Sequence, residues 1–545
     1  MGLKHAALPL WEQATYWVCE GAAIIYMMYS LYCASEDAWR RNEPIKLENG
    51  WTFLNRPRDF ADSEWDFWSH YIWQVIPWMA GHLILSHVLR MDLKFHRYKK
   101  VLLTLYSILV IGQLLGFRTL LFFCAQSLIL YLASAVSSVA CVWTAGIILL
   151  TVLNYGEHAV CRYLYLGEAS QNLEKYYYVL VYVWANLIQR WLAFCLERVW
   201  AQRNIRETPV LQAYPSSVTH KKTPVENFAL PNGGVTVLKE VPTLLDMFYY
   251  AFYIPLFFTG PLIVYKDFHM QEKLSQPCSR DRLRDILLNI VRIMFWTFVN
   301  CTILHFFYAH ALIENSVVLG KENRWVLTAV GYFVGQFFMM KYIVIFGLPA
   351  QLARIDGFEP PTVPACVSYI YCYTDMWKYF DKGLYDFMKR YIFIPCGGSQ
   401  HGFGYQLLGS VLCFLYVFYW HGAEYYLFLW CLINLFEVIF EQLGASLEST
   451  HFVRDKFYSK LSPAGIRRVR AVSSVPLLFM SLFAIFYFFG GSSSGPIFLS
   501  KLLLDIPWDC FLLFLVLVYC GVQNAMEIDR LGLGKLRRVV HVHDT

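Results

Sequence analysis

Charged side chains are scarce in this sequence. Only 16% of its 545 residues are Asp, Glu, Lys or Arg, whereas 57% are hydrophobic and 18% are aromatic, and the mean hydropathy is +0.40. A water-soluble globular protein has few ways to hide so much apolar surface. The composition therefore excludes an ordinary soluble domain and predicts a chain whose solvent is largely lipid.

Signals of several other protein classes are also missing. The N-terminus lacks the basic start and small-residue cleavage site of a secretory signal, so the first apolar run is expected to remain as a signal anchor. Ala6 stands where a myristoylation motif needs Ser or Thr, so no lipid is expected at Gly2. The absence of internal repeats counts against transporters built on inverted repeats. Without a His, Cys and carboxylate cluster at zinc spacing, no zinc site is predicted.

Apolar runs about as long as a bilayer-crossing helix recur along the chain. They predict one all-α, polytopic domain over residues 1–545 with about 10 to 13 membrane segments. Residues 35–70 are expected to form an interfacial segment, and residues 197–242 a mobile cytosolic loop. The expected spans lie near residues 15–34, 71–90, 100–117, 119–137, 139–155, 177–196, 244–265, 285–312, 326–348, 405–420, 423–441, 473–490 and 506–525.

The stretch from residue 350 to residue 402 differs in kind. It combines many charged residues with many aromatic rings, and strongly apolar runs flank it on both sides. It is too polar to span lipid. Re-entrant backbone that lines a cavity is one interpretation, and an amphipathic loop at the membrane surface is the other.

Ionisable residues inside apolar runs are the next candidates. His421 lies in or at the edge of the membrane, where it is either functional or an imidazole satisfied by a carbonyl at a helix end. His305 and His310 are five residues apart, which is not the spacing of a helical metal pair, so both are expected in the core or at the interface. Cys366 follows a Pro-Pro pair, where a thiol is either structural or a metal or haem ligand.

Longer motifs carry a resemblance to a known family. The motifs are Lys341-Tyr342 with Phe346-Gly347-Leu348-Pro349, Asp356-Gly357 with Pro360-Pro361, Met376-Trp377-Lys378-Tyr379-Phe380-Asp381, Gly397-Gly398-Ser399-Gln400-His401-Gly402 and Tyr419-Trp420-His421-Gly422. With these motifs the sequence from Lys341 to Gly422 resembles the membrane-bound O-acyltransferase superfamily, and within it the branch that palmitoylates hedgehog-type secreted proteins. Weaker similarity extends upstream, through Glu64-Trp65-Asp66-Phe67-Trp68 among other motifs, and covers most of the chain.

The resemblance implies a polytopic acyltransferase with re-entrant segments around a central acyl-CoA tunnel, located in the membrane of the endoplasmic reticulum or the Golgi. It makes His421 the catalytic histidine and Asp381 its partner, at a position where O-acylating relatives carry Asn. A non-catalytic branch lacks the histidine of the Trp-His-Gly motif, so His421 favours an enzyme. The resemblance also makes Cys366 the thiolate ligand of a structural haem b.

The donor is expected to lie along the segment from residue 350 to residue 402. The resemblance places Trp377 and the rings of the same segment, among them Tyr379 and Tyr385, along the acyl-CoA tunnel. The basic residues Lys378, Lys382, Lys389 and Arg390 are candidates to bind the CoA phosphates. These basic residues equally fit the excess of positive charge on the cytosolic side of membrane proteins. Lys378 replaces the Arg of the family motif, which keeps the charge but loses the planar fork of a bidentate phosphate contact.

A second departure lies in the late span. The family places an Asn shortly before a Gly-Gly pair, but residues 482–489 before Gly490-Gly491 contain none. The expected activity is transfer of palmitate from palmitoyl-CoA to the N-terminal cysteine amine of a hedgehog-type secreted protein. The alternatives are an O-acyltransferase acting on a serine hydroxyl or a lipid, a non-catalytic scaffold of the same family, and a transporter or channel.

Overall fold

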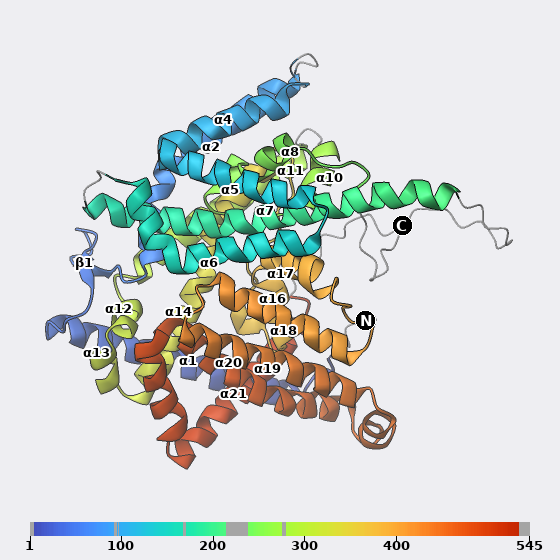
Figure 1. The fold of residues 1–545 in the computed structure, drawn as a ribbon. Coiled ribbons are helices and arrows are strands. Elements are labelled where there is room, and N and C mark those ends of the chain that lie inside the picture. Colours follow the sequence, from blue (N-terminus) through green and yellow to red (C-terminus); the bar gives the residue numbers. More distant parts are fainter. Residues whose placement is uncertain are drawn as a thin grey trace.

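The computed structural model describes residues 5–91, 95, 97–166, 170–213, 238–274 and 279–533. Helices make up most of this part of the chain (Figure 1). One short antiparallel hairpin pairs Leu47 with Asp59. The fold is all-α, as the sequence predicted.

Most helices are joined by short connections, whereas longer segments separate α1 from α2 and α7 from α8. Strands β1 and β2 span Leu47–Asn49 and Pro57–Asp59. Short 3-10 helices span Val367–Tyr369 and Tyr458–Lys460, and π-helical turns span Lys389–Phe393, Phe452–Phe457 and Ser500–Leu504. The helices are α1 (Leu10–Arg40), α2 (Ser63–Met91), α4 (Lys99–Leu115), α5 (Phe117–Ala135), α6 (Val139–Leu164), α7 (Ser170–Ala213), α8 (Leu244–Ala251), α9 (Ile254–Phe257), α10 (Tyr265–Leu274), α11 (Arg280–Ile303), α12 (Ala309–Glu314), α13 (Ser316–Lys321), α14 (Arg324–Ile345), α15 (Gly347–Ile355), α16 (Tyr373–Tyr379), α17 (Lys382–Met388), α18 (Phe403–Trp420), α19 (Tyr425–Glu448), α20 (Pro463–Leu499) and α21 (Trp508–Arg530).

Eleven helices within the described ranges are long and apolar enough to cross a membrane. This number falls within the predicted range. Figure 1 shows most of the long helices running across the view, with β1, α12 and α13 gathered at one end. The chain therefore has the build of a multi-pass membrane protein.

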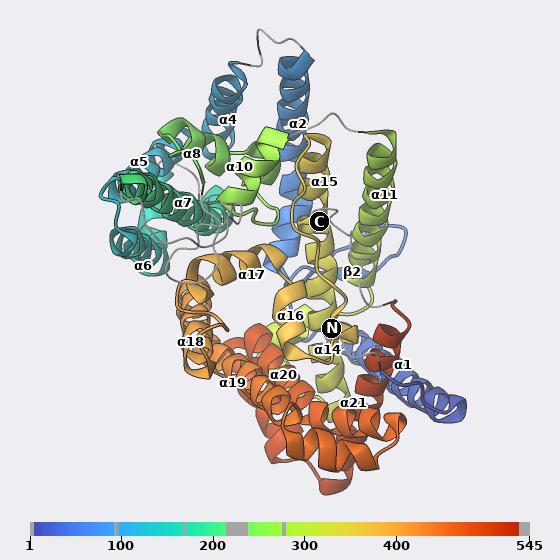
Figure 2. The same cartoon turned by 90° about the vertical axis from the view of Figure 1, so that its right-hand side faces the viewer.

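Burial divides these spans into inner and outer helices. In its most apolar window, α7 is 78% buried, whereas α1 and α11 are each only 17% buried. Leu287, Val291 and Phe295 of α11 remain exposed, as expected for side chains that face lipid tails. Figure 2 shows α14, α16 and α17 between a group formed by α5, α6 and α7 and a group formed by α18 to α21. The inner helices thus border the polar segment that follows α15, most of which is only partly buried.

Several predicted boundaries are wrong. Residues 244–265 do not form a span but fold into α8, α9 and an extended stretch buried in protein, because Pro255, Gly260 and Pro261 interrupt the helix. The predicted span 285–312 ends at Ile303, where a turn leads into α12. Helix α4 covers the predicted span 100–117 but has only 17 residues, which is short for a crossing.

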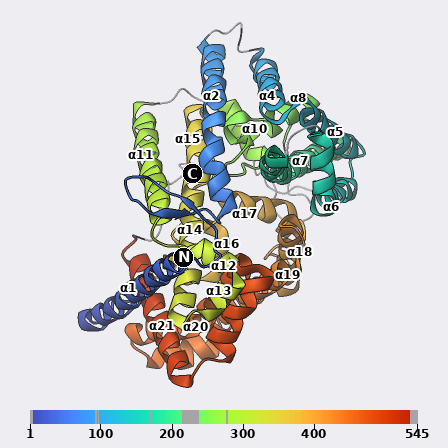
Figure 3. The same ribbon diagram turned by 90° about the vertical axis from the view of Figure 1, so that its left-hand side faces the viewer.

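Two predicted polar segments also differ. The predicted loop 197–242 begins as helix, because α7 continues to Ala213; residues 214–237 lie outside the described residues. Within 35–70, α1 extends to Arg40, a hairpin follows, and α2 begins at Ser63. In the hairpin, the Asp59 N–H donates to the Leu304 carbonyl (2.9 Å), which fixes β2 beside the turn before α12 (Figure 3).

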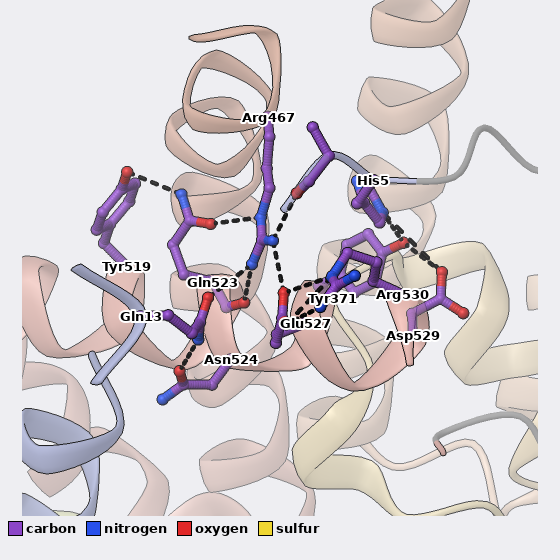
Figure 4. Close-up of polar contacts among 11 residues, drawn as sticks. His5, Gln13, Tyr371, Arg467, Tyr519, Gln523, Asn524, Glu527, Asp529 and Arg530 are labelled. Atoms are coloured by element: carbon purple, nitrogen blue, oxygen red, sulfur yellow. Dashed lines mark hydrogen bonds and ion pairs between the residues drawn. The ribbon is translucent and has the colours of Figure 1, made fainter. Parts of the chain in front are cut away.

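Arg467 of α20 ties the first and last long helices together (Figure 4). Its side chain is 1% exposed and donates to the side chains of Gln13 (3.0 Å), Gln523 (3.0 Å) and Glu527 (2.7 Å). It also donates to the backbone oxygens of Ala6 and Gln523, at 2.8 Å each. These bonds match the five N–H donors of a guanidinium, so the buried charge is fully satisfied.

Replacing Arg467 should destabilise the protein strongly. Breaking a buried, hydrogen-bonded pair typically costs about 3–5 kcal/mol, because the remaining groups stay buried without partners. We therefore expect Arg467→Ala to lower the melting temperature of the detergent-purified protein. Arg40→Ala is the control, because Arg40 is 75% exposed and Glu36 is its one ion-pair partner among the residues that the structure describes. Equal melting temperatures of the two variants would contradict the role of Arg467.

Candidate active site

A cavity of about 440 Å³ lies in the interior of the helix bundle. Its wall is built from α1, α7, α14, α20, α21 and the irregular segment after α15. Small-molecule sites usually occupy about 300–1,000 Å³, so the cavity has the size of a ligand site. Most of the wall is apolar and aromatic, with Phe338, Phe346, Phe380, Trp420 and Trp430 among its rings. Such a wall suits a long hydrocarbon chain.

His421 lies in this wall, directly after α18. Two bonds hold the end of the helix: Asn154 donates to the Tyr419 carbonyl (2.7 Å), and Trp420 Nε1 donates to the Ala185 carbonyl (3.3 Å). Gly422 then turns the chain with a φ of 118°, which a side chain would disfavour. The position of His421 is therefore set by α6 and α7 as well as by its own helix.

The His421 imidazole is surrounded by rings rather than by polar partners. Its ring centroid is 5.4 Å from that of Trp430 and 5.9 Å from that of Phe488. Among the described residues it has no hydrogen-bond partner, so the structural alternative of a carbonyl-satisfied imidazole is not supported. Burial lowers the pKa of His421 to about 4, which keeps the imidazole neutral at physiological pH.

Asp381 lines the same cavity. It is the N-cap of α17 and accepts a hydrogen bond from the Leu384 N–H (2.9 Å). Burial raises the pKa of Asp381 to about 6, and backbone N–H groups of Leu384 and Gly383 partly oppose this rise. No hydrogen bond or ion pair joins Asp381 to His421, so the two side chains line one cavity without forming a bonded pair.

Gly383 sets the position of Asp381. A Cβ at Gly383 would lie 2.6 Å from the Leu262 carbonyl oxygen and 2.7 Å from the Leu262 nitrogen. Only glycine allows α17 to approach this backbone so closely. Gly260 and Leu262 line the cavity as well, so the stretch after α9 supports the wall beside Asp381.

Trp377 is the one predicted substrate-binding residue that the structure places in the cavity wall. Its ring packs edge-on against Phe414 (4.9 Å between centroids) and obliquely against Trp430 (5.7 Å). The Trp377 Nε1 atom is buried and has no hydrogen-bond partner among the described residues. Trp377 and His421 thus both contact Trp430.

The other predicted binding residues do not line this cavity. The residues that line the cavity do not include four predicted binding residues: Lys378 and Tyr379 of α16, Tyr385 of α17, and Arg390 of the π-helical turn that follows α17. The Lys378 ammonium lies 5.1 Å from the centroid of the Tyr379 ring. Arg390 donates to the carboxylate of Glu197, which is fully buried. Their contacts with CoA stay predictions.

Cys366 offers no geometric support for haem. A haem needs an axial ligand that faces an apolar slot. Cys366 is partly exposed. The next residue, Val367, lines the cavity, but Cys366 does not, so its thiol is not part of the cavity wall. Within the described ranges, no group of three or more His, Cys, Asp and Glu residues could hold a metal ion. Haem ligation stays a prediction of the family resemblance.

Sequence reasoning missed several polar residues of the cavity. Asn186 and Gln189 of α7, Gln336 of α14 and Asn434 of α19 all line it. Each lies within a long apolar helix, where a polar side chain is costly unless it has a role. That rule would have found them in the sequence. His305 and His310, which were expected in the core or at the interface, are both buried, and His305 accepts a hydrogen bond from the Trp51 N–H (3.0 Å).

A family model of the membrane-bound O-acyltransferase family matches residues 128–485, which is more than half of the chain. The chain belongs to the membrane-bound O-acyltransferase family. The matched range includes α7, α14 and both cavity residues, Asp381 and His421. Membership agrees with the polytopic helical fold and with a cavity that suits an acyl chain.

Known relatives in this family narrow the branch. The chain is 28% identical to the mouse (Mus musculus) protein-cysteine N-palmitoyltransferase HHAT over 508 residues, which cover 92% of this chain and 95% of the relative. It is 30% identical to the Drosophila melanogaster protein-cysteine N-palmitoyltransferase Rasp over 261 residues, 46% of this chain and 50% of the relative. It is 24% identical to the mouse protein-cysteine N-palmitoyltransferase HHAT-like protein over 532 residues, 97% of each chain.

A methyl group at Gly383 should impair acyl transfer more than it impairs folding. It would push α17, and with it Asp381, away from Leu262. A misplacement of about 1 Å can cost about 10²-fold in rate, and we expect a loss of this order in kcat/KM for Gly383→Ala. Gly404→Ala is the matched control, because a Cβ there meets nothing within 4 Å. Full activity of Gly383→Ala would show that Asp381 tolerates displacement.

Proposed function

We propose that this chain is a protein-cysteine N-palmitoyltransferase that moves palmitate from palmitoyl-CoA to the N-terminal cysteine amine of a hedgehog-type secreted protein. One observation carries the proposal: His421 and Asp381 line the same large apolar cavity within the membrane-embedded bundle. The similarity to two named N-palmitoyltransferases supports the choice of donor and acceptor. Residues 1–545 act as one domain, in which the segment 350–402 contributes the catalytic Asp381.

The donor occupies the cavity with its acyl chain against the aromatic wall and its thioester near His421. Trp377, with its free indole N–H, is positioned to contact the thioester or the adjoining pantetheine arm. The CoA phosphates reach the cytosolic side, where Lys378 and Arg390 are candidates to bind them, with Tyr379 and Tyr385 beside them. The acceptor enters from the lumen of the endoplasmic reticulum, so one cavity joins reactants from two compartments.

Transfer proceeds without an acyl-enzyme, because acyl-CoA is already an activated thioester. The neutral amine attacks the thioester carbonyl, and the nitrogen becomes strongly acidic once it is bonded to that carbon. His421, neutral at physiological pH, removes this proton as general base. The C–S bond then breaks, and the departing CoA thiolate takes the proton from His421. Asp381 aligns the thioester and stabilises the transient imidazolium through the field of its carboxylate.

The alternative functions differ in which group, if any, receives the acyl chain. An O-acyltransferase would modify a serine hydroxyl or a lipid, and a non-catalytic scaffold would transfer nothing. Asp381 favours an amine acceptor only through the family resemblance, so the acceptor has to be tested directly. Haem at Cys366 is not needed for any step of this transfer.

The first experiment measures label transfer by the detergent-purified protein. Alkynyl palmitoyl-CoA is supplied with a peptide that begins with cysteine and matches a hedgehog N-terminus. We expect His421→Ala to lose about 10²–10⁴-fold in rate, the usual contribution of a general base. His158→Ala is the control, because His158 is largely exposed and does not line the cavity.

Blocking the amine separates the alternatives. An N-acetylated peptide should accept no label if the α-amine is the acceptor, whereas an O-acyltransferase would still label a serine-containing peptide. Transfer that is indifferent to both the amine and His421 would refute the proposal. No transfer by a well-folded protein would favour the scaffold.

The rate should also depend on pH through Asp381. Its pKa of about 6 means that the carboxylate is ionised above this pH and neutral below it, whereas His421 stays neutral down to about pH 4. We therefore expect kcat to fall as the pH drops through about 6, and the Asp381→Asn variant to lack this step. The profile is measured at saturating peptide. An unchanged step in Asp381→Asn would assign it to another group.

A further inference from the structure

The proposed reaction releases one proton that His421 does not account for. An α-ammonium has three N–H bonds, whereas the amide product has one. His421 passes one of the two lost protons to the CoA thiolate, so the other must leave the site. With a pKa near 7.7–8.0, most of the acceptor amine arrives as ammonium at neutral pH. The site needs a second proton acceptor, which must work before the amine attacks.

A buried chain of polar groups reaches the cavity from the end that carries the hairpin and α12. Tyr342 of α14 lines the cavity, and its hydroxyl donates to Glu64 Oε1 of α2 (2.8 Å). The other oxygen of Glu64 accepts from the Lys341 ammonium (2.8 Å). The Glu64 side chain is 26% exposed, whereas that of Lys341 is only 5% exposed, so Glu64 is the more accessible of the two groups.

The charge of this group is negative. Lys341 also pairs with Asp62 at 2.8 Å, so two carboxylates share one ammonium. His310 Nε2 lies 3.5 Å from Asp62, but burial lowers the pKa of His310 to about 4, and the ring adds no positive charge at neutral pH. Asp59, 3.8 Å from His310, has a pKa raised to about 7 by burial and adds at most further negative charge. A cation in the cavity beside Tyr342 would therefore be attracted.

The remaining ionisable groups near Glu64 and Tyr342 do not change this sign. Tyr182 of α7 and Asp381 also interact with Tyr342, and both line the cavity. A neutral phenol and a carboxylate add no positive charge. Tyr342 therefore connects the two regions: it lines the cavity, and its hydroxyl is hydrogen-bonded to Glu64 of the negatively charged group.

We propose that Glu64, acting through the Tyr342 hydroxyl, takes the proton that the acceptor ammonium must lose before it attacks the thioester; this rests on the function proposed above. One N–H bond of the ammonium breaks and its proton moves to the Tyr342 oxygen. The Tyr342 O–H proton moves at the same time to Glu64, whose carboxylate becomes a carboxylic acid. Glu64 then passes the proton to water. Glu64 is a positioning residue for this transfer, since only Tyr342 contacts the acceptor.

A purely structural role makes a different prediction. Lys341, Asp62 and Glu64 could simply lock α2 against α14, and losing the lock would then lower activity equally at every pH and for every acceptor. A proton acceptor matters only when the incoming nitrogen carries a proton. The pH profile and the acidity of the acceptor therefore separate the two roles.

The experiment measures kcat/KM for the cysteine peptide with the full-length Glu64→Gln and Tyr342→Phe variants between about pH 6.5 and 9, which brackets the amine pKa. At pH 7 we expect a loss of about tenfold or more, the low end of what a proton-transferring side chain contributes. The loss should shrink as the pH approaches 9, because the amine then arrives neutral. A peptide with an aminooxy N-terminus, which is neutral at pH 7, should be acylated by the variants nearly as well as by the unaltered protein.

Two variants serve as controls for lost polar contacts. Glu43→Gln removes a carboxylate that pairs with Lys321 (3.4 Å) at the same end of the molecule. Tyr106→Phe removes a hydroxyl that donates to the Trp78 carbonyl (2.8 Å) away from the cavity. Both should keep the pH profile of the unaltered protein.

The outcomes are distinguishable. Profiles of Glu64→Gln and Tyr342→Phe that run parallel to that of the unaltered protein, or an equal loss with the aminooxy acceptor, would overturn the proton transfer and leave the N-palmitoyltransferase intact. No transfer to the free-amine peptide by the unaltered protein would overturn both proposals. Melting temperatures show whether the variants fold. If Glu64→Gln does not fold, Tyr342→Phe still tests the proton transfer, because it keeps the ring and its packing.

Discussion

Irregular backbone inside a membrane protein must be kept away from lipid, and much of this fold follows from that constraint. Between Gly357 and Gly402 the chain forms only short helices and turns, whose N–H and C=O groups cannot all be paired within the segment. The long inner helices α7 and α14 and the group α18 to α20 surround it. Short helices also expose their first turn, and the N-cap of α17 places Asp381 at the cavity.

The interior contains two kinds of ionisable group, those paired with other polar groups and those without a charged partner among the described residues. Arg467 has five hydrogen bonds, and the carboxylate of Asp356 accepts from Ser86 (2.5 Å), Arg90 (2.8 Å) and Tyr253 (2.9 Å). Paired in this way, buried charges no longer bear the full cost of desolvation. His421 and Asp381 have no ion-pair partner among the described residues. Burial lowers the pKa of His421 and raises that of Asp381, and each shift favours the neutral form of the side chain. Groups left in that state can change protonation during a reaction.

Composition and the length of apolar runs were enough to predict the helical membrane fold, because lipid allows few other solutions. The positions where apolar runs are interrupted and do not cross the membrane were harder to predict. Residues 244–265 are as apolar as a span, and only Pro255, Gly260 and Pro261 hinted that protein rather than lipid surrounds them. For the site, the family motifs pointed to His421, Asp381 and Trp377, which share one cavity. Tyr342 and Glu64 were not foreseen as a pair, because their contact joins residues 278 positions apart.

The contacts of Arg467 have a consequence for biosynthesis. Its partners Ala6 and Gln13 are made first, yet the bonds form only after a further 454 to 461 residues have been synthesised. Until then the first helix lacks its contacts with α21, and the wall that α1 and α21 together contribute to the cavity does not exist. Assembly of this end of the bundle is therefore a late event. A chain stalled before α21 would lack Gln523 and Glu527, and the Arg467 guanidinium would keep only Ala6 and Gln13 of these partners and lose its one carboxylate.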